Sequence, residues 1–266
     1  MNNGKNDLTE GSIGRKLISF FLPIAAGTLF QQLYNAADAI VVGKFVGTIA
    51  LAAVGGSAAH ITNLLIGFFV ALSGGSTVVI AQLFGAKDEE SIQKATGTAI
   101  AFCIISGIVL TIVGFAFTPV FLRVLQSPPD TIAESTTYLR IVFLGVTAQL
   151  LYNMEAGMLQ AVGDSKSPFI YLFICCMINI FLDLLLVAVF KMGVAGAAIA
   201  TIASQIMSAV LATAKLMRSK EAYRITLKGI GLHRKLLGRM LHIGIPAGLQ
   251  SSMYAISNMI IQVAVN

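Results

Sequence analysis

The sequence has 266 residues, of which 56% are hydrophobic and only 11% are charged, and its formal net charge is +6. Ordinary globular chains hold roughly 45–50% hydrophobic and about 25% charged residues, whereas the mean hydropathy here is +0.84. This composition excludes a soluble globular domain, because only lipid can cover so much apolar surface.

Seven long apolar runs follow one another along the chain, each bounded by charged residues, Gly or Pro. An apolar run of about 20 residues crosses a bilayer as a helix and satisfies its own backbone hydrogen bonds there. A transmembrane β-barrel would need segments of alternating polarity, and these runs do not alternate. The sequence therefore predicts an all-α polytopic membrane protein with helices at residues 17–42, 51–84, 92–122, 138–162, 169–190, 194–216 and 240–265.

Basic residues are distributed unevenly between the two sides that this helix order defines. If the N-terminus is cytoplasmic, the only Lys and Arg residues on the outward side are Lys44, Arg123, Arg140 and Lys191. Such a bias agrees with the positive-inside rule. We expect a multi-pass protein of a bacterial or archaeal cell (inner) membrane. Its positive charge then reflects topology and contact with membrane lipid, with no case for nucleic-acid binding.

An internal repeat begins near the end of the chain. Leu22-Pro23-Ile24-Ala25 recurs as Ile245-Pro246-Ala247-Gly248, and at the same shift Asn35 falls on Asn258. Chance recurrence of Pro and Gly in membrane helices is the alternative. Parallel repeats of two membrane halves are common in transporters. We expect a cytoplasmic segment (1–16), a six-helix N-lobe (17–217), a basic cytoplasmic linker (218–238) and the first helix of an incomplete C-lobe (239–266). The native form is then a single longer chain of two lobes.

Carboxylates inside the apolar runs are costly, by about 2.5–3.5 kcal/mol each on insertion scales, so each one needs a reason. Asp38 and Asp183 are the clearest cases. Glu155 lies near the inner end of the fourth helix, where a wet interfacial position and a functional position are both open. The three cysteines, Cys103, Cys175 and Cys176, lie in apolar runs and are expected to be packing residues.

Polar residues form stripes on three of the predicted helices. At 3.6 residues per turn, Gln31, Tyr34, Asn35 and Asp38 fall within about 100° of one another. Asn179 and Asp183 are one turn apart, and the sixth helix carries a third stripe that includes Thr201. Counted from the outward ends of their helices, the depths of Asp38, Asp183 and Thr201 agree within roughly 6 Å at 1.5 Å per residue.

Two carboxylates, an amide and a hydroxyl are therefore expected to converge in the outer half of the bundle. Oxygen ligands of this kind suit a proton or a hard cation such as Na⁺. Hydrogen bonding between helices is the alternative role, and for Ser, Thr and Gln it is the favoured one. Pro23 removes a backbone hydrogen bond from the first helix, which permits either a hinge or a static kink.

These residues resemble the multidrug and toxic compound extrusion (MATE) family of transporters, in particular its DinF-like branch. The resemblance covers essentially the whole chain. Its markers are the first-helix pattern from Leu22 through Gln31, Tyr34 and Asp38 to Gly43, the run AQLFGAK at 81–87, the run GMLQAVGDSKSP at 157–168 and the run NIFLD at 179–183.

The resemblance implies two six-helix lobes and export of organic cations or amphipathic drugs in exchange for H⁺ or Na⁺. It implies a coupling site at Asp38, Asn179, Asp183 and Thr201, and a hinge at Pro23. Gln31, Tyr34, Asn35 and Asn153 are expected as substrate or supporting polar lining. We expect a drug-like small-molecule substrate, no cofactor apart from the coupling ion, and no metal beyond Na⁺ at the same four residues.

Two other functions compete with antiport. A flippase for a lipid-linked or polysaccharide precursor would belong to the same superfamily, but its phosphate-bearing cargo favours a basic cavity, whereas the polar residues here are carboxylates and amides. An intramembrane enzyme is not expected, because the sequence contains no His-Glu-x-x-His pair and no Gly-x-Ser-x-Gly turn.

Overall fold

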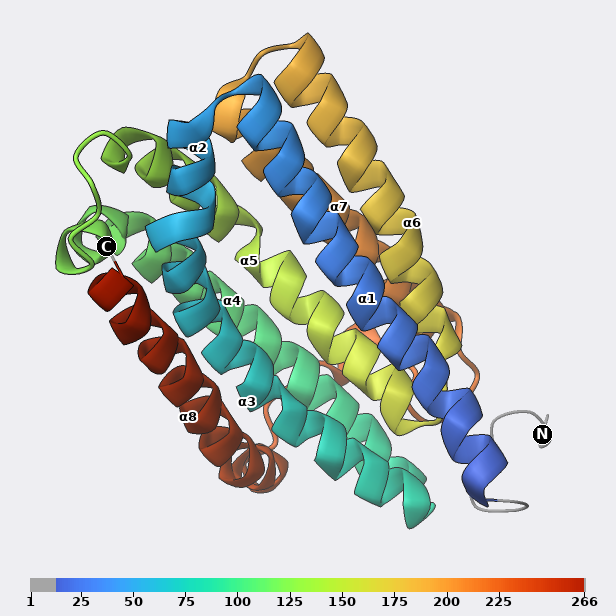
Figure 1. The fold of residues 1–266 in the computed structure, drawn as a ribbon. Helices are drawn as coiled ribbons and strands as arrows, with labels where there is room; N and C mark the ends of the chain where they lie inside the picture. Colours follow the sequence, from blue (N-terminus) through green and yellow to red (C-terminus); the bar gives the residue numbers. More distant parts are fainter. Residues whose placement is uncertain (1–12, 266) are drawn as a thin grey trace.

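The computed structural model describes residues 13–265, and within this range the chain is a bundle of long helices with no strand (Figure 1). The prediction of an all-α fold is confirmed. The α-helices are α1 (Ile13–Phe45), α2 (Thr48–Ala53), α3 (Ala59–Gly85), α4 (Glu89–Val124), α5 (Ile132–Ala161), α6 (Lys166–Asp183), α7 (Gly193–Arg218) and α8 (Arg234–Val265). Three shorter segments join them, namely η1 (Val54–Ala58), η2 (Leu184–Val189) and η3 (Leu227–Gly229).

All seven predicted helices are present in the described chain, and five of them are long and apolar enough to cross a membrane by length and composition. These five spans are 17–45, 48–85, 89–124, 166–189 and 193–218. Helices α5 and α8 are long as well, but they carry more polar residues. In α5 these include Glu155, which is buried in the bundle, and in α8 they include three basic residues in the first two turns.

The second span is interrupted near its N-terminal end. Val54–Ala58 forms a π-helical segment, and Gly56 there has non-helical backbone angles (φ −88°, ψ −119°). His60 follows one turn later, and its Nδ1 donates to the Gly56 carbonyl oxygen at 2.8 Å. A Gly-Gly pair in a membrane helix is consistent with either close packing or local bending, and at Gly55-Gly56 the backbone angles show bending. A second π-helical segment, Leu184–Val189, directly follows Asp183.

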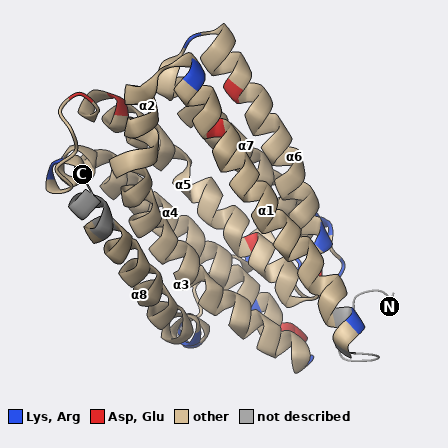
Figure 2. Cartoon of the chain, viewed as in Figure 1, with Lys and Arg blue, Asp and Glu red and all other residues tan. Residues whose placement is uncertain are grey.

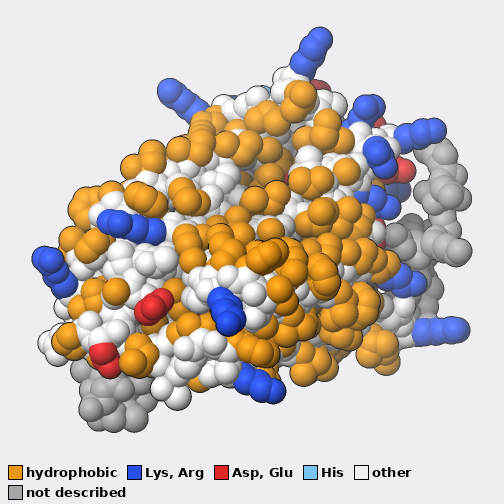
Figure 3. All heavy atoms as spheres, turned by 90° about the horizontal axis from the view of Figure 1, so that it is seen from above, with side chains coloured by type: hydrophobic (Ala, Val, Ile, Leu, Met, Phe, Trp, Pro, Cys, Tyr) orange, Lys and Arg blue, Asp and Glu red, His pale blue; other side chains and the backbone are white. Residues whose placement is uncertain are grey.

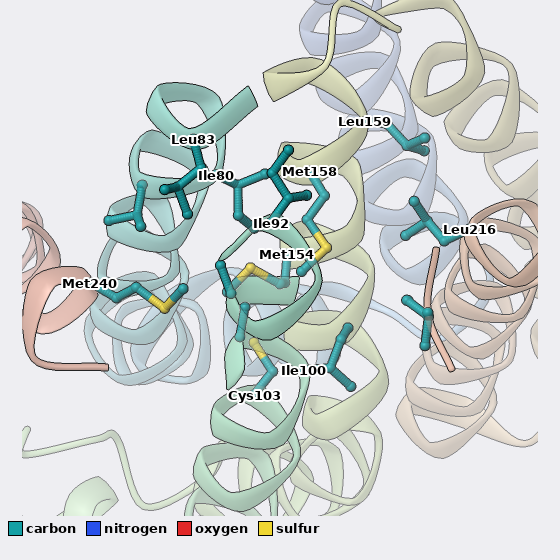
Figure 4. Close-up of a cluster of buried hydrophobic side chains, with 14 residues drawn as sticks. Ile80, Leu83, Ile92, Ile100, Cys103, Met154, Met158, Leu159, Leu216 and Met240 are labelled. Carbon is teal, nitrogen blue, oxygen red and sulfur yellow. The ribbon is translucent and has the colours of Figure 1, made fainter. Parts of the chain in front are cut away.

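The main apolar core lies where α3, α4 and α5 meet. Figure 4 shows Met154 and Met158 of α5 between side chains of α3 and α4, among them Ile80 and Ile92. All four of these side chains are at most 2% exposed. Cys103 lies in the same core, and Cys103, Cys175 and Cys176 are free and buried, as expected for packing residues.

Helix α8 packs along α3 with close backbone approach. A Cβ atom at Gly244 would collide with the Leu72 carbonyl oxygen, and one at Gly75 would collide with the Met240 carbonyl oxygen. Only Gly permits this approach. We call the contact through Gly75 and Gly244 the glycine seam. Since α8 begins at Arg234, its first turn lies inside the interval expected to be a linker.

The segment between α7 and α8 is fixed to α4. The Thr98 hydroxyl lies 3.1 Å from the Gly231 carbonyl oxygen and accepts from the His233 backbone N–H at 3.2 Å. Thr98 is fully buried, and a Cβ at the neighbouring Gly97 would collide with the Gly229 carbonyl oxygen. These contacts hold the connection between α7 and α8 against the bundle.

The surface of the bundle is largely apolar. In the space-filling view of Figure 3, hydrophobic side chains cover much of the visible face, and Lys and Arg side chains project from its margins. Helix α1 alone exposes Leu17, Ile18, Phe21, Leu22, Leu29, Leu33 and Ile40. A surface of this kind suits contact with lipid.

Candidate functional site

The polar stripe of α1 is partly buried and partly exposed. Tyr34 and Asp38 point into the bundle, and Asp38 is 8% exposed. Gln31 and Asn35, on the other half of the stripe, are exposed. The structure therefore brings only Tyr34 and Asp38 toward α6 and α7, and the role of Gln31 and Asn35 as polar lining stays a prediction.

The carboxyl groups of Asp38 on α1 and Asp183 on α6 are close neighbours. Figure 2 shows the acidic positions on α1 and α6 toward the end of the bundle where α2 lies. Asp183 is 1% exposed. The single salt bridge among the described residues joins Lys94 to Glu90, far from this pair. The two acids are therefore buried together without a counter-charge from the described chain.

Several polar atoms of this group have no hydrogen-bond donor or acceptor in the described structure. They are Oδ1 of Asp38, both carboxyl oxygens of Asp183 and both side-chain polar atoms of Asn179, which is fully buried. A buried polar group without a partner costs about 1–3 kcal/mol. Because no donor reaches the Asp183 oxygens, a hydrogen bond between the two acids requires a proton on one of them.

Hydroxyl groups surround the acid pair from α1, α5 and α7. The Tyr34 and Thr201 hydroxyls are neighbours, and the Thr201 hydroxyl donates to the Ala197 carbonyl oxygen at 3.0 Å. Tyr138 of α5 lies close enough to feel the charges of Asp38, Asp183 and Tyr34. The sequence reasoning did not select Tyr138, and a hydroxyl inside an apolar run was the one available signal.

We call the group of Tyr34, Asp38, Asn179, Asp183 and Thr201 the acid-pair site. Helix α6 places two of its members, because Asn179 and Asp183 are one turn apart and both face inward. The four residues predicted to bind the coupling ion lie in one region of the bundle. Asp38 is next to Asp183, and Asn179 is buried one turn from Asp183. Thr201 is next to Tyr34.

Two other predicted residues lie apart from the acid-pair site. The Asn153 amide donates to the Gln149 carbonyl oxygen of its own helix at 2.8 Å, and its predicted role as lining is not tested by this contact. Pro23 lies inside α1, and its predicted role as a hinge likewise stays a prediction.

Glu155 is fully buried, so of the two positions that the sequence left open, the burial argues against contact with water at the interface. Its Oε1 accepts from the Thr213 hydroxyl of α7 at 2.5 Å, and its Oε2 has no partner among the described residues.

The acid-pair site offers oxygen ligands and exchangeable protons. Carboxyl, amide and hydroxyl oxygens bind H⁺ or hard cations. No group of three or more His, Cys, Asp or Glu side chains that could hold a metal ion occurs in the described part of the chain. Chemically, the site is suited to take up one positive charge, as a proton or a small cation, and to release it again.

A family model and a curated relative both match this chain. A family model described as MatE matches residues 23–185. The chain is 30% identical over 265 residues to the probable multidrug resistance protein YoeA of Bacillus subtilis, in an alignment that covers 97% of this chain and 57% of YoeA. The chain thus spans little more than half the length of this relative.

Two solved transporter structures have the same fold as this chain. A MOP superfamily transporter from Pyrococcus furiosus, described as having a binding pocket of reversed polarity that suggests a different function, superposes with a TM-score of 0.86 at 25% identity, over 94% of this chain and 56% of that chain. An outward-facing multidrug resistance MATE family transporter superposes with a TM-score of 0.83 at 26% identity, over 91% of this chain and 53% of that chain.

Proposed function

The chain belongs to the MATE family of membrane transporters, and from this premise we propose that it acts in drug efflux as a cation-coupled antiporter. Its cargo would be an organic cation or an amphipathic drug-like molecule, and the exchanged ion would be H⁺ or Na⁺. The observation that carries the proposal is the pair Asp38 and Asp183, buried together with no counter-charge from the described chain.

In this proposal the acid pair alternates between a charged form and a neutral form. Entry of a proton or Na⁺ neutralises the repulsion between the two carboxyl groups, and loss of the ion restores it. Asp38 lies on α1, which packs chiefly against α6, whereas Asp183 lies on α6 itself. Charging the pair therefore pushes α1 away from α6, which biases α1 between two positions. Thr201 and Asn179 supply further oxygen ligands when the cation is Na⁺.

The cargo proposal draws support from the relatives and from the charge of the site. YoeA is described as a probable multidrug resistance protein, and an acidic site attracts organic cations. A flippase for phosphate-bearing lipid precursors, the second candidate from the sequence, would need basic groups to hold phosphate. The polar groups of the acid-pair site are acids, an amide and hydroxyls, and this argues against that cargo.

Orientation and lobe arrangement complete the proposal. We propose a cytoplasmic N-terminus in the cell membrane, since the basic residues between α7 and α8 then lie on the cytoplasmic side. We also propose that α8 is the counterpart of α1 in a second lobe. Pro23 and Pro246 each lie inside a long helix and near its beginning, as the sequence repeat requires.

The test is transport in liposomes that contain the protein, with a fluorescent organic cation as cargo and an imposed gradient of either H⁺ or Na⁺. Asp38→Asn and Asp183→Asn should each remove the dependence on the gradient, which for a coupling of 1–3 kcal/mol is a loss of about 5–150-fold. The control is Asp130→Asn, which removes an exposed carboxylate outside the site. Gradient-driven transport that survives both substitutions would refute the proposed coupling, and the effective gradient identifies the ion.

A further inference from the structure

The second buried acid, Glu155, has a place of its own in the bundle. Figure 2 shows an acidic position on α5 toward the end of the bundle opposite to α2, away from the acidic positions on α1 and α6. Seventeen residues of α5 separate Glu155 from Tyr138, the α5 residue beside the acid-pair site, which corresponds to about 25 Å along the helix. Glu155 therefore does not belong to the acid-pair site.

Among the described residues, no Lys, Arg or His forms an ion pair with Glu155. Its one hydrogen bond comes from Thr213 of α7. From α4, the Cys103 thiol is the titratable group close enough to feel the Glu155 charge, and it is engaged with the Ser73 hydroxyl and the Leu150 carbonyl oxygen. Lys215, two residues beyond Thr213, is exposed. An ionised carboxylate in this position would have one neutral donor and no cation, which is a costly arrangement.

A structural role alone does not explain a carboxyl group here. A Gln side chain would offer Thr213 the same carbonyl oxygen without the cost of a titratable group in the membrane. What a carboxyl group adds is the capacity to bind and release a proton. Oε1 is already an acceptor, and Oε2 is buried without a partner, so Oε2 is the atom that is free to hold the proton.

The local geometry favours a proton over Na⁺. A sodium ion needs several oxygen ligands with free lone pairs, comparable to the hard cations that take six or more. Around Glu155 one hydroxyl, that of Thr213, makes a hydrogen bond, and the neighbouring titratable group on α4 is a thiol, so few oxygen ligands are at hand. Six residues separate Glu155 from Ala161, the end of α5, so the path to that surface is about 9 Å along the helix.

We propose that Glu155 is a second exchangeable proton site, carried on Oε2, reached from the end of the bundle where α5 ends and independent of the acid-pair site. A proton from water at that surface binds the carboxylate and is returned to the same water when the pH rises. The two sites would let a single bundle hold protons at two depths. The proposal does not depend on coupling at Asp38 and Asp183.

The test is infrared difference spectroscopy of the purified protein in lipid, recorded between about pH 5 and about pH 9, a range that spans the proton exchange of perturbed carboxyl groups. Wild-type and Glu155→Gln proteins are compared, because Gln keeps the shape and the acceptor for Thr213. We expect the carbonyl band of a protonated acid that is lost on raising the pH and is absent from Glu155→Gln. Thr213→Val should shift the position of this band, since it removes the one hydrogen bond, whereas Thr213→Ser should not.

Three results would overturn the proposal. A Glu155 acid band that stays constant over the whole pH range shows a permanently neutral structural group. The absence of such a band at every pH shows a permanent carboxylate. A band that disappears on adding Na⁺ at constant pH, but not on adding choline, shows a cation site instead. The same comparison in an Asp38→Asn, Asp183→Asn background keeps this test separate from the acid pair, and circular dichroism verifies that each variant is folded.

Discussion

Helix α1 lies against α6 mainly through side chains, whereas α8 lies against α3 backbone to backbone. Phe30 of α1 meets Phe169 and Phe173 of α6 edge to face, with ring centroids 5.9 and 5.1 Å apart. In the most apolar window of α1 only 6% of residues are buried, against 39% in that of the span that contains α3. The glycine seam leaves no room even for one methyl group at Gly244.

The difference places the acid-pair site on the side of the bundle that is easier to move. Asp38 lies on α1, the least buried of the five apolar spans. Its partners Asn179 and Asp183 lie on α6, which contacts α1 through aromatic rings. Close-packed interfaces resist small displacements, because each one loses many contacts at once. We therefore expect ion binding to displace α1 and to leave the contact of α3 with α8 unchanged. The following substitutions test this contrast.

The largest effect is expected from Asn179→Leu in the acid-pair site. Both polar atoms of Asn179 are buried without partners, so an apolar side chain of similar size should raise the free energy of unfolding by about 1–3 kcal/mol. Ion-driven transport should fall by about 5–150-fold, since an oxygen ligand is lost. Thermal unfolding in detergent and transport in liposomes measure the two effects.

Asn153→Leu is the matched control, because the Asn153 amide is already hydrogen-bonded to Gln149 and its loss should not stabilise the protein. If Asn179→Leu instead destabilised the fold, Asn179 would have a structural partner and the contrast between the two helix pairs would be weakened.

A substitution in the glycine seam should change the free energy of unfolding by a similar amount but in the opposite direction, with no loss of ion coupling. Gly244→Leu forces α8 away from the Leu72 carbonyl oxygen, and such overpacking lowers the free energy of unfolding by about 1–3 kcal/mol. Gly238→Leu, on the same helix, meets open space and should be neutral or slightly stabilising, because Leu favours the helix more than Gly does. Thermal unfolding of the two variants decides the matter, and equal melting temperatures would show that the seam opens freely.

Pro23→Ala tests whether α1 bends. Alanine restores the backbone hydrogen bond to the Ser19 carbonyl oxygen, worth about 0.5–1.5 kcal/mol. Amide hydrogen exchange around this turn should therefore slow by about 2–13-fold. Pro246→Ala in α8 serves as the comparison, and there we expect less slowing because Gly244 already holds the turn against α3. Equal slowing in both helices would mean that α1 is no more mobile than α8.

The smallest expected effect is a change in melting temperature from a substitution at the start of α4. The Ser91 hydroxyl and backbone N–H donate to Asp88, and these hydrogen bonds hold the pKa of that carboxyl below its usual value. A carboxyl group whose pKa is lowered in the folded state stabilises the protein at pH values above its ordinary pKa of about 4. This stabilisation is lost as the pH falls through the lowered pKa.

Asp88→Ser keeps a capping side chain but removes the charge. The melting temperature of wild type minus that of Asp88→Ser should therefore be slightly positive near neutral pH and should shrink in strongly acidic solution. A difference that does not change with pH would exclude the capping carboxylate as its cause.

Helix boundaries show how far the sequence alone can be followed. The seven apolar runs identified all seven long helices, yet α4 begins at Glu89 and not at residue 92, because Asp88 caps a first turn that is polar. In the sequence, the interruption at Gly56 appears only as a pair of glycines, which is consistent with close packing as well as with bending. Apolar periodicity reports which residues avoid water, and polar helix ends lie outside that signal.

For the candidate site, the sequence determined which residues are polar and where each lies along its helix. The tertiary structure decided which of them meet. It divided the stripe of α1 between Tyr34 and Asp38 inside and Gln31 and Asn35 outside, and it enclosed Glu155 against Thr213. The physical reason is that helical periodicity is a local property, whereas the rotation of one helix against another depends on the size of side chains far away in the sequence.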